Sequence, residues 1–132
     1  MSNKFNVLLI DDELDFLFSL SRLLSRRGIG VKTANGGQEG LDILEHSEFD
    51  CIILDLCMPT MDGLDTLKRM RQRDQFTPVI LLTGKGDMAS VLSALNVGEV
   101  TYLSKPCLIE DLITAIENAS ERKSLIISRI ES

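Results

Sequence analysis

The sequence lacks a hydrophobic run long enough to cross a membrane and has few cysteines. No apolar stretch of the 132-residue chain approaches the roughly 18 residues that a transmembrane helix needs. The N-terminal residues lack the apolar centre of a secretory signal peptide. The three cysteines, Cys51, Cys57 and Cys107, are an odd number at spacings unlike those of metal sites. These absences predict a cytoplasmic protein with reduced thiols and no membrane contact.

Positive charge and histidine are also scarce. The chain has 14 Lys and Arg residues against 20 Asp and Glu residues, and the net charge of −6 argues against direct binding to nucleic acid or anionic lipid. The single histidine, His46, falls in a predicted exposed helix and is interpreted as a solvated side chain. No internal repeat or interior linker appears, and the length suits one domain.

Five short predicted strands alternate with helical patterns along the chain. They cover residues 7–10, 31–34, 51–54, 79–82 and 100–103, of which 7–10, 51–54 and 79–82 are continuous apolar runs and 31–34 is weaker. Continuous apolar runs without polar alternation are typical of parallel strands that are buried on both faces. Aliphatic residues at helical spacing follow each run, and the last helix begins near Leu108. The pattern predicts an α/β fold with a parallel sheet covered by helices on both faces.

Local signals indicate where several of these elements begin and end. Gly28 suits a helix stop, and Asp62 and Asp87 suit the N-caps of the third and fourth helices. Pro59 fixes an extended turn after the third strand, because proline restricts its own backbone and that of its predecessor. Gly40 weakens the prediction of the second helix, since glycine costs about 1 kcal/mol relative to alanine.

Polar side chains follow the predicted strands at the point where each strand ends. Asp11 and Asp12 follow the first strand, Asp55 the third, Thr83 the fourth, and Lys105 lies after the fifth. The carboxyl ends of parallel strands meet at one edge of a sheet, so we expect these groups to lie close together. Clustered carboxylates need a cation, and hard oxygen ligands favour Mg²⁺ or Mn²⁺. With Lys105 and Thr83 beside the phosphoryl oxygens, the set suits phosphoryl transfer to Asp55 as nucleophile.

The motifs in this order resemble those of a known family. They are Asp11-Asp12-Glu13, Asp55-Leu56-Cys57-Met58-Pro59, Asp62-Gly63, Thr83-Gly84 and Tyr102-Leu103-Ser104-Lys105-Pro106. On these elements they resemble the receiver domain of two-component response regulators, from Val7 to about Ala119. The resemblance implies a flavodoxin-like, doubly wound, five-stranded parallel sheet in the order 2-1-3-4-5 with five helices.

The resemblance also implies the chemistry of the site. Asp55 would accept a phosphoryl group from the phosphohistidine of a sensor histidine kinase or a histidine phosphotransfer protein. Asp12, Asp55 and the backbone carbonyl of Cys57 would ligate Mg²⁺, for which Mn²⁺ can substitute, and Asp11 would act through water. Lys105 would pair with the phosphoryl oxygens. Such a chain catalyses only its own aspartyl phosphorylation and dephosphorylation and is not a turnover enzyme.

The same resemblance implies a switch. Thr83 would move towards the phosphoryl group, and Tyr102 would swing inward behind it. This movement would reach the face formed by the fourth helix, the fifth strand and the fifth helix, where Glu99 and Thr101 depart from the family's usual small and acidic residues. The Lys105–Pro106 bond is expected to be cis. We expect Thr83 and Lys105 to lie at an open crevice, where they contribute little to folding.

Three other functions remain as alternatives on this predicted fold. A haloacid-dehalogenase-like phosphatase also phosphorylates an aspartate, but it needs an acid where this chain has Cys57, and there is no room for its cap domain. A flavodoxin-like binding module would need a glycine-rich loop in place of Asp11-Asp12-Glu13. A receiver-like module that signals without phosphate is disfavoured by the complete set of Asp12, Asp55, Thr83 and Lys105.

The C-terminal residues extend beyond the predicted core. We expect the receiver domain to span residues 1–119, with residues 120–132 forming a helix extension or a linker to a missing output domain. The tail holds four large aliphatic residues, Leu125, Ile126, Ile127 and Ile130, of which Ile126, Ile127 and Ile130 continue a heptad-like stripe that Lys123 interrupts. The alternatives are a frayed end, because short isolated helices are marginal in water, or a helix that joins a second copy in a homodimer.

Overall fold

A computed structural model describes residues 4–58, 62–84 and 88–131 of the chain. Pro59 and Asp87, to which the sequence assigned a turn and a helix cap, lie outside the described residues. Strands and helices alternate in the order β1 (Phe5–Ile10), α1 (Leu14–Arg26), β2 (Ile29–Ala34), α2 (Gly37–Leu44), β3 (Cys51–Leu54), α3 (Gly63–Arg73), β4 (Val79–Thr83), α4 (Met88–Ala94), β5 (Val100–Ser104) and α5 (Ile109–Glu131).

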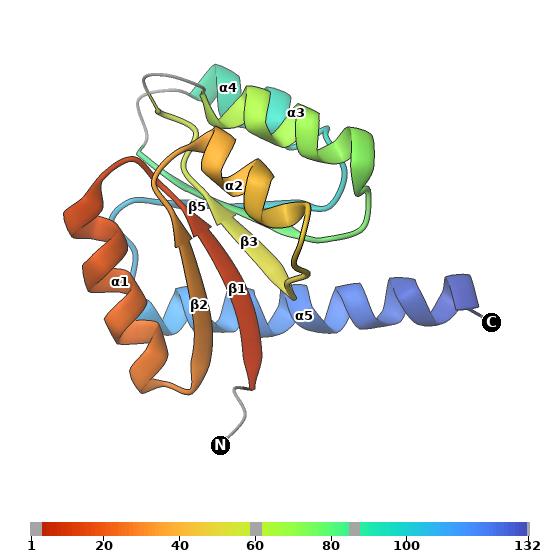
Figure 1. Cartoon of the computed structure of the whole chain (residues 1–132), viewed down its shortest axis with the longest axis horizontal. Coiled ribbons are helices and arrows are strands. Elements are labelled where there is room, and N and C mark those ends of the chain that lie inside the picture. The colour runs from red at the N-terminus through yellow and green to blue at the C-terminus, as the bar shows by residue number, and fades with distance from the viewer. Residues whose placement is uncertain (1–3, 59–61, 85–87, 132) are drawn as a thin grey trace.

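The five strands form one parallel sheet in the order β2-β1-β3-β4-β5, which confirms the predicted fold (Figure 1). The register pairs Ile10 of β1 with Ala34 of β2 and with Leu54 of β3. Thr83 of β4 pairs with Ser104 of β5 in the same way. The carboxyl ends of β1, β3, β4 and β5 therefore lie along one edge of the sheet.

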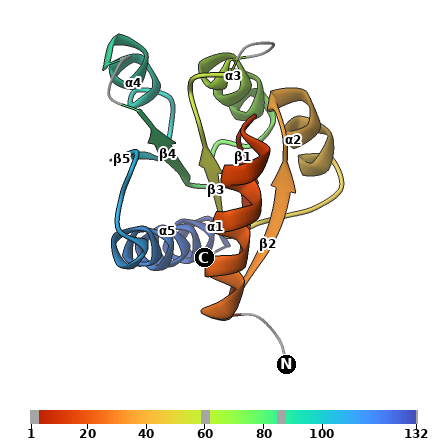
Figure 2. The same ribbon diagram turned by 90° about the vertical axis from the view of Figure 1, so that its left-hand side faces the viewer.

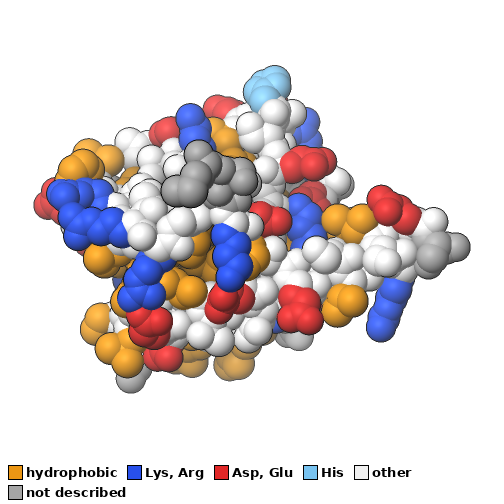
Figure 3. Space-filling view, turned by 90° about the horizontal axis from the view of Figure 1, so that it is seen from below, with side chains coloured by type: hydrophobic (Ala, Val, Ile, Leu, Met, Phe, Trp, Pro, Cys, Tyr) orange, Lys and Arg blue, Asp and Glu red, His pale blue; other side chains and the backbone are white. Residues whose placement is uncertain are grey.

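The last helix is longer than the sheet it covers. Its buried residues are Leu112, Ile116, Ala119 and Ser120, and the helix then continues without a break to Glu131. The far end of α5 projects beyond the rest of the molecule (Figures 1 and 3). None of the described helices is both long and apolar enough to span a membrane.

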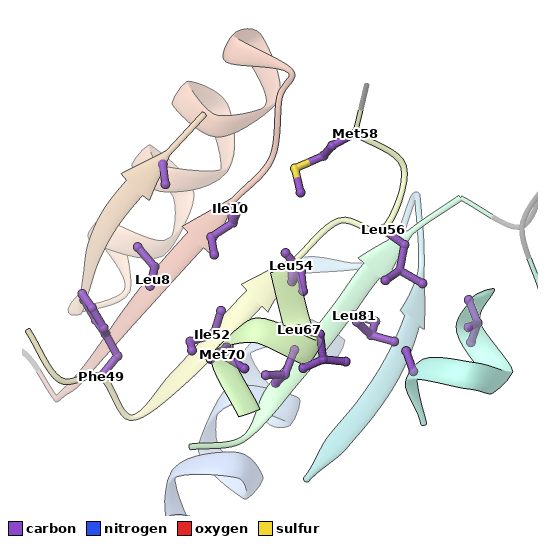
Figure 4. Close-up of a cluster of buried hydrophobic side chains, with 14 residues drawn as sticks. Leu8, Ile10, Phe49, Ile52, Leu54, Leu56, Met58, Leu67, Met70 and Leu81 are labelled. Atoms are coloured by element: carbon purple, nitrogen blue, oxygen red, sulfur yellow. The ribbon is translucent and has the colours of Figure 1, made fainter. Parts of the chain in front are cut away.

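Two hydrophobic clusters lie on opposite faces of the sheet. Strand residues alternate between them, because successive side chains of a strand point to opposite faces. Leu8 and Ile10 pack with α2, α3 and α4 in the cluster of Figure 4. Val7 and Leu9 pack with α1 and α5 in the other cluster. Figures 1 and 2 show the corresponding layers, with α1 and α5 on one side and α2, α3 and α4 on the other.

Local backbone features follow most of the sequence signals. Gly28 ends α1 with a φ of +79°, and the Asp62 carboxylate caps α3 by accepting a hydrogen bond of 2.8 Å from the Asp65 N–H. The glycine at position 40 has a packing reason, since a Cβ there would lie 2.5 Å from Cδ1 of Ile10. The prediction of a helical His46 is wrong, because α2 ends at Leu44 and His46 lies in the exposed turn that follows.

Candidate functional site

Backbone hydrogen bonds hold the strand ends in place. The Asp11 N–H donates to the Ala34 carbonyl at 3.1 Å, and the Asp55 N–H donates to the Ile10 carbonyl at 3.1 Å. The Lys105 N–H donates to the Thr83 carbonyl at 2.8 Å, so the β4–β5 ladder extends as far as the lysine. These bonds fix the relative positions of the side chains that the sequence placed at this edge.

Three carboxylates converge there. Asp11, Asp12 and Asp55 each place one oxygen within 4.8 Å of the others. Asp11 and Asp55 are only 1% and 5% exposed, whereas Asp12 reaches solvent. Burial raises the pKa of Asp11, although its contacts with Lys105 and the Glu13 N–H act in the opposite direction. A set of hard oxygen atoms at this spacing, with one open side, fits a Mg²⁺ or Mn²⁺ ion.

Lys105 supplies the positive charge of the cluster. Its Nζ lies 2.7 Å from Oδ2 of Asp11, 3.5 Å from Oδ2 of Asp55 and 3.5 Å from Oε1 of Glu13. Burial disfavours the ammonium ion, but the hydrogen bond and charge of Asp11, with the charges of Asp55 and Glu13, together outweigh burial and raise the pKa of Lys105. The Lys105–Pro106 peptide bond is cis, as predicted. The ammonium thus lies closest to Asp11, a carboxylate that the sequence assigned only to the metal.

Thr83 contacts Asp55 directly. Its Oγ1 hydroxyl donates a hydrogen bond of 2.7 Å to Oδ1 of Asp55, which also accepts one of 3.2 Å from the Cys57 N–H. The expectation that Thr83 lies at an open crevice is wrong, because the residue is 0% exposed. Its side chain is enclosed because it fills the space beneath the carboxylate, where it satisfies a buried acceptor.

Cys57 and Tyr102 lie near this centre in different ways. The Cys57 side chain is exposed, and its Sγ lies 3.9 Å from Oγ1 of Thr83. Tyr102 is half-buried and packs against the core cluster on the α4 side of the sheet. Its hydroxyl oxygen is buried, and no described residue forms a hydrogen bond with it. The ring therefore occupies an inward position in this structure.

Three neighbours of the site carried no role in the sequence interpretation. Glu13 pairs with Lys105, and the Phe16 ring lies beneath the same ammonium. Gly63 begins α3 against the backbone of the site, where a Cβ would lie 2.2 Å from the Asp55 carbonyl oxygen. The Asp62-Gly63 pair predicted a turn at this position. The need for glycine at position 63 follows from its contact with the Asp55 backbone, which the sequence alone does not show.

The family model of the response regulator receiver domain matches residues 7–117 of the chain. The chain belongs to the response regulator receiver family. Receiver domains of transcriptional response regulators are signalling modules and not turnover enzymes. The family match confirms the identity predicted from the motifs, whereas the roles of the individual residues stay predictions.

Proteins and structures similar to this receiver domain support the assignment. The chain is 35% identical over 119 residues to the transcriptional regulatory protein FixJ of Bradyrhizobium diazoefficiens, covering 90% of this chain and 58% of FixJ. It is 39% identical over 110 residues to CpxR of Escherichia coli, covering 83% of this chain and 47% of CpxR. The chain thus spans about half the length of these relatives.

A solved receiver domain protein from Clostridium thermocellum matches with a TM-score of 0.85 and 37% identity, covering 92% of this chain and 98% of that one. A structure described as adenylate cyclase from Rhodopirellula baltica matches with a TM-score of 0.89 and 32% identity, covering 98% of this chain and 96% of that one. The receiver fold therefore occurs in structures that carry different names, so the fold alone does not identify the output of this chain.

Proposed function

We propose that this receiver domain accepts a phosphoryl group on Asp55 and signals through the change that follows. The observation that carries the proposal is the buried Asp55 carboxylate, which contacts Thr83 and Lys105 and lies beside two further acids. One edge of the sheet thus holds the nucleophile Asp55, a binding site for a divalent cation and the positive side chain of Lys105. Phosphoryl transfer requires this combination of positioning and charge neutralisation.

Each residue has a distinct part in the proposed reaction. An Asp55 oxygen forms a bond to phosphorus while the bond from phosphorus to the histidine nitrogen of the donor breaks, and the leaving imidazole nitrogen takes up a proton. Asp12, Asp55 and the Cys57 carbonyl would hold Mg²⁺ or Mn²⁺ directly and Asp11 would do so through water, and the ion would neutralise phosphoryl oxygens when bound. Lys105 would exchange Asp11 for a phosphoryl oxygen. Asp11 would then turn to the bound cation, which would offset the loss of its 2.7 Å contact with Lys105.

The donor would be a sensor histidine kinase or a histidine phosphotransfer protein. Exposed apolar side chains flank the site on α1 and on the loop before α5, and Figure 3 shows orange side chains at the α1 end of the molecule. They are Leu14, Phe18, Leu23 and Leu108. A groove of about 410 Å³ lies between these two elements and reaches Lys105. A partner docked over it would place its phosphohistidine near Asp55. The three free thiols fit the cytoplasmic location expected of this exchange.

The signal would leave through α4, β5 and α5. Thr83 on β4 contacts Asp55, and Tyr102 on β5 packs on the α4 side, so a shift of the threonine would reach this face. Arg122 of α5 joins the two unusual residues of the face, lying 3.2 Å from the Thr101 hydroxyl and 3.7 Å from Glu99. The target would be an output domain or a separate protein. FixJ and CpxR are named as transcriptional regulators, but this chain itself would not contact nucleic acid.

Chemical labelling tests the assignment of Asp55. We expect acetyl phosphate with Mg²⁺ to add one phosphoryl mass to the intact protein, and we expect Asp55→Asn to abolish the addition. Asp42→Asn on α2 is a matched control, because Asp42 is an exposed acid outside the acid cluster of the site. Full labelling of Asp55→Asn would refute the acceptor. Binding of a target without phosphate would favour the phosphate-independent alternative, and turnover of a phosphate ester would favour the dehalogenase-like phosphatase.

A homodimer through α5 is a second candidate function. Beyond Lys123 the helix face that covers the sheet continues with Ile126, which is half-buried, and with Ile130, which is exposed. An exposed helical stripe of this kind fits a second copy of the helix, or an output domain that continues the chain.

A further inference from the structure

The Lys105 ammonium is in contact with an aromatic ring as well as with carboxylates. Its Nζ lies 4.1 Å from the centroid of the Phe16 ring on α1, well within the range of a cation–π interaction. Phe16 is half-buried, packs with the core cluster beneath α1, and lines the same groove as Lys105. Three structural elements therefore meet at the lysine, with Asp11 and Asp55 at the ends of β1 and β3 and the ring on α1.

The Phe16 ring differs from the acids because it can keep its contact with Lys105 when a cation and a phosphoryl group bind at the site. A cation in the acid cluster would take oxygens of Asp11 and Asp55 away from Lys105. The Phe16 ring binds neither a cation of this cluster nor a phosphoryl oxygen, so it keeps its contact with the ammonium. It also carries no formal charge, and therefore it attracts the lysine without repelling an incoming phosphoryl group.

We propose that Phe16 is a positioning residue for Lys105, which holds the ammonium over the site while the lysine exchanges its carboxylate partner for a phosphoryl oxygen. The inference rests on the proposed function of Asp55. Without the ring, the long lysine side chain would have to be ordered by charge alone, and side chains of this type lose much rotational freedom when they are fixed.

Phosphorylation kinetics with a small donor test the proposal, because no docking partner is then involved. At saturating Mg²⁺ we expect Phe16→Leu and Phe16→Met to slow acetyl phosphate labelling of Asp55 about two- to five-fold, the loss expected for a partly exposed cation–π pair. Phe16→Trp should retain the rate. Phe5→Leu is the matched control, since Phe5 is half-buried in the same cluster and its ring lies 5.4 Å from Lys4.

A double-mutant cycle separates positioning from packing. In the Lys105→Met background, Phe16→Leu should have no further effect on the labelling rate. In the unphosphorylated protein, the methylene resonances next to Nζ of Lys105 should lose their ring-current shift in Phe16→Leu and keep it in Phe5→Leu. An equal loss of rate in the Lys105→Met background, or an unchanged lysine resonance, would refute the role of Phe16.

The two proposals fail separately in these experiments. If the lysine resonance responds to Phe16→Leu but no variant is labelled at Asp55, the proposed function fails and the contact stands. If the wild-type protein is labelled at Asp55 and both Phe16→Leu and Phe16→Met are labelled at the same rate, only the positioning role of Phe16 fails.

Discussion

The guanidinium group of Arg71 lies directly beneath Gly98, in the turn between α4 and β5. Its Nε donates to the Val97 carbonyl at 3.0 Å and its Nη2 to the Glu99 carbonyl at 2.9 Å, one on each side of the glycine. Its Nη1 donates to the Thr77 carbonyl at 2.7 Å. Gly98 has a φ of +78°, and a Cβ there would lie 2.5 Å from the Arg71 Nε. Arg71 thus joins α3 to the starts of β4 and β5.

We therefore expect Arg71→Lys to lower the free energy of unfolding by about 2–3 kcal/mol, because a lysine cannot reach carbonyl groups in several directions at once and leaves buried acceptors unpaired. Chemical denaturation measures the change. Arg69→Lys on the exposed face of α3 should stay within about 0.5 kcal/mol of the wild type. Equal stability of the two variants would show that Arg71 is not a structural residue.

Asp12 is the most solvent-accessible acid of the candidate metal site, and its removal tests the site. We expect Asp12→Ala to weaken Mg²⁺ binding by at least about ten-fold, since it removes a direct oxygen ligand, and to leave folding intact. Titration of Mg²⁺ monitored by NMR measures the affinity. Asp15→Ala, an exposed acid on α1, should bind Mg²⁺ like the wild type. Unchanged affinity in Asp12→Ala would remove this residue from the proposed ligand set.

Thr83 should influence both stability and signalling, because its hydroxyl is buried against Asp55. Thr83→Ala should cost about 1 kcal/mol of stability, while Thr83→Ser keeps the hydrogen bond and costs less. We expect beryllofluoride with Mg²⁺ to change the NMR signals of Tyr102 in the wild type and in Thr83→Ser but not in Thr83→Ala. A full response of Tyr102 in Thr83→Ala would show that the threonine does not transmit the change.

The Asp74 carboxylate at the end of α3 predicts a pH dependence of stability. It accepts hydrogen bonds of 2.9 Å and 3.1 Å from the N–H groups of Phe76 and Thr77. Burial opposes its ionisation, but the bonds from the Thr77 hydroxyl and these N–H groups outweigh burial and lower the pKa of Asp74. A lowered pKa in the folded state means that the charged form stabilises the fold above the ordinary pKa of an aspartate. That contribution is lost as the pH falls through the folded-state pKa.

We therefore expect Asp74→Asn to destabilise the protein by about 1 kcal/mol at pH 7, and we expect the difference from the wild type to shrink below about pH 4. Urea unfolding at several pH values measures it. Asp65→Asn, which removes an exposed acid at the start of α3, is the matched control for the loss of one negative charge. A difference that grows as the pH falls would contradict the assigned role of the Asp74 charge.

The projecting end of α5 leads to a prediction about association. If a second copy binds there, Ile126→Ser with Ile130→Ser should shift a concentration-dependent dimer to monomer in analytical ultracentrifugation. Thr114→Ser, at an exposed position on the part of α5 that lies along the sheet, is the control. A chain that is monomeric at every concentration, phosphorylated or not, would exclude the homodimer. The apolar stripe at the end of α5 would then be assigned to contact with an output domain.

The sequence by itself determined the architecture and placed the acids, Thr83 and Lys105 at one edge of the sheet. Buried parallel strands need continuous apolar runs, and acids placed directly after such runs must meet at one sheet edge, so Asp11 and Asp55 could be paired without a structure. The helix stop at Gly28 and the cap at Asp62 depend on their own backbone and near neighbours. Helix caps and stops of this kind can therefore be predicted from the sequence.

The tertiary structure alone decided which groups contact one another across that edge. Lys105 lies closer to Asp11 than to Asp55, and its aromatic partner Phe16 lies on α1. Both contacts join segments that are distant in sequence, so they depend on how these elements pack together. The buried Thr83 hydroxyl and the Arg71 fork depend likewise on segments that are distant in sequence. Such contacts are set by the packing of side chains from several elements into one volume, and no spacing along the chain encodes that volume.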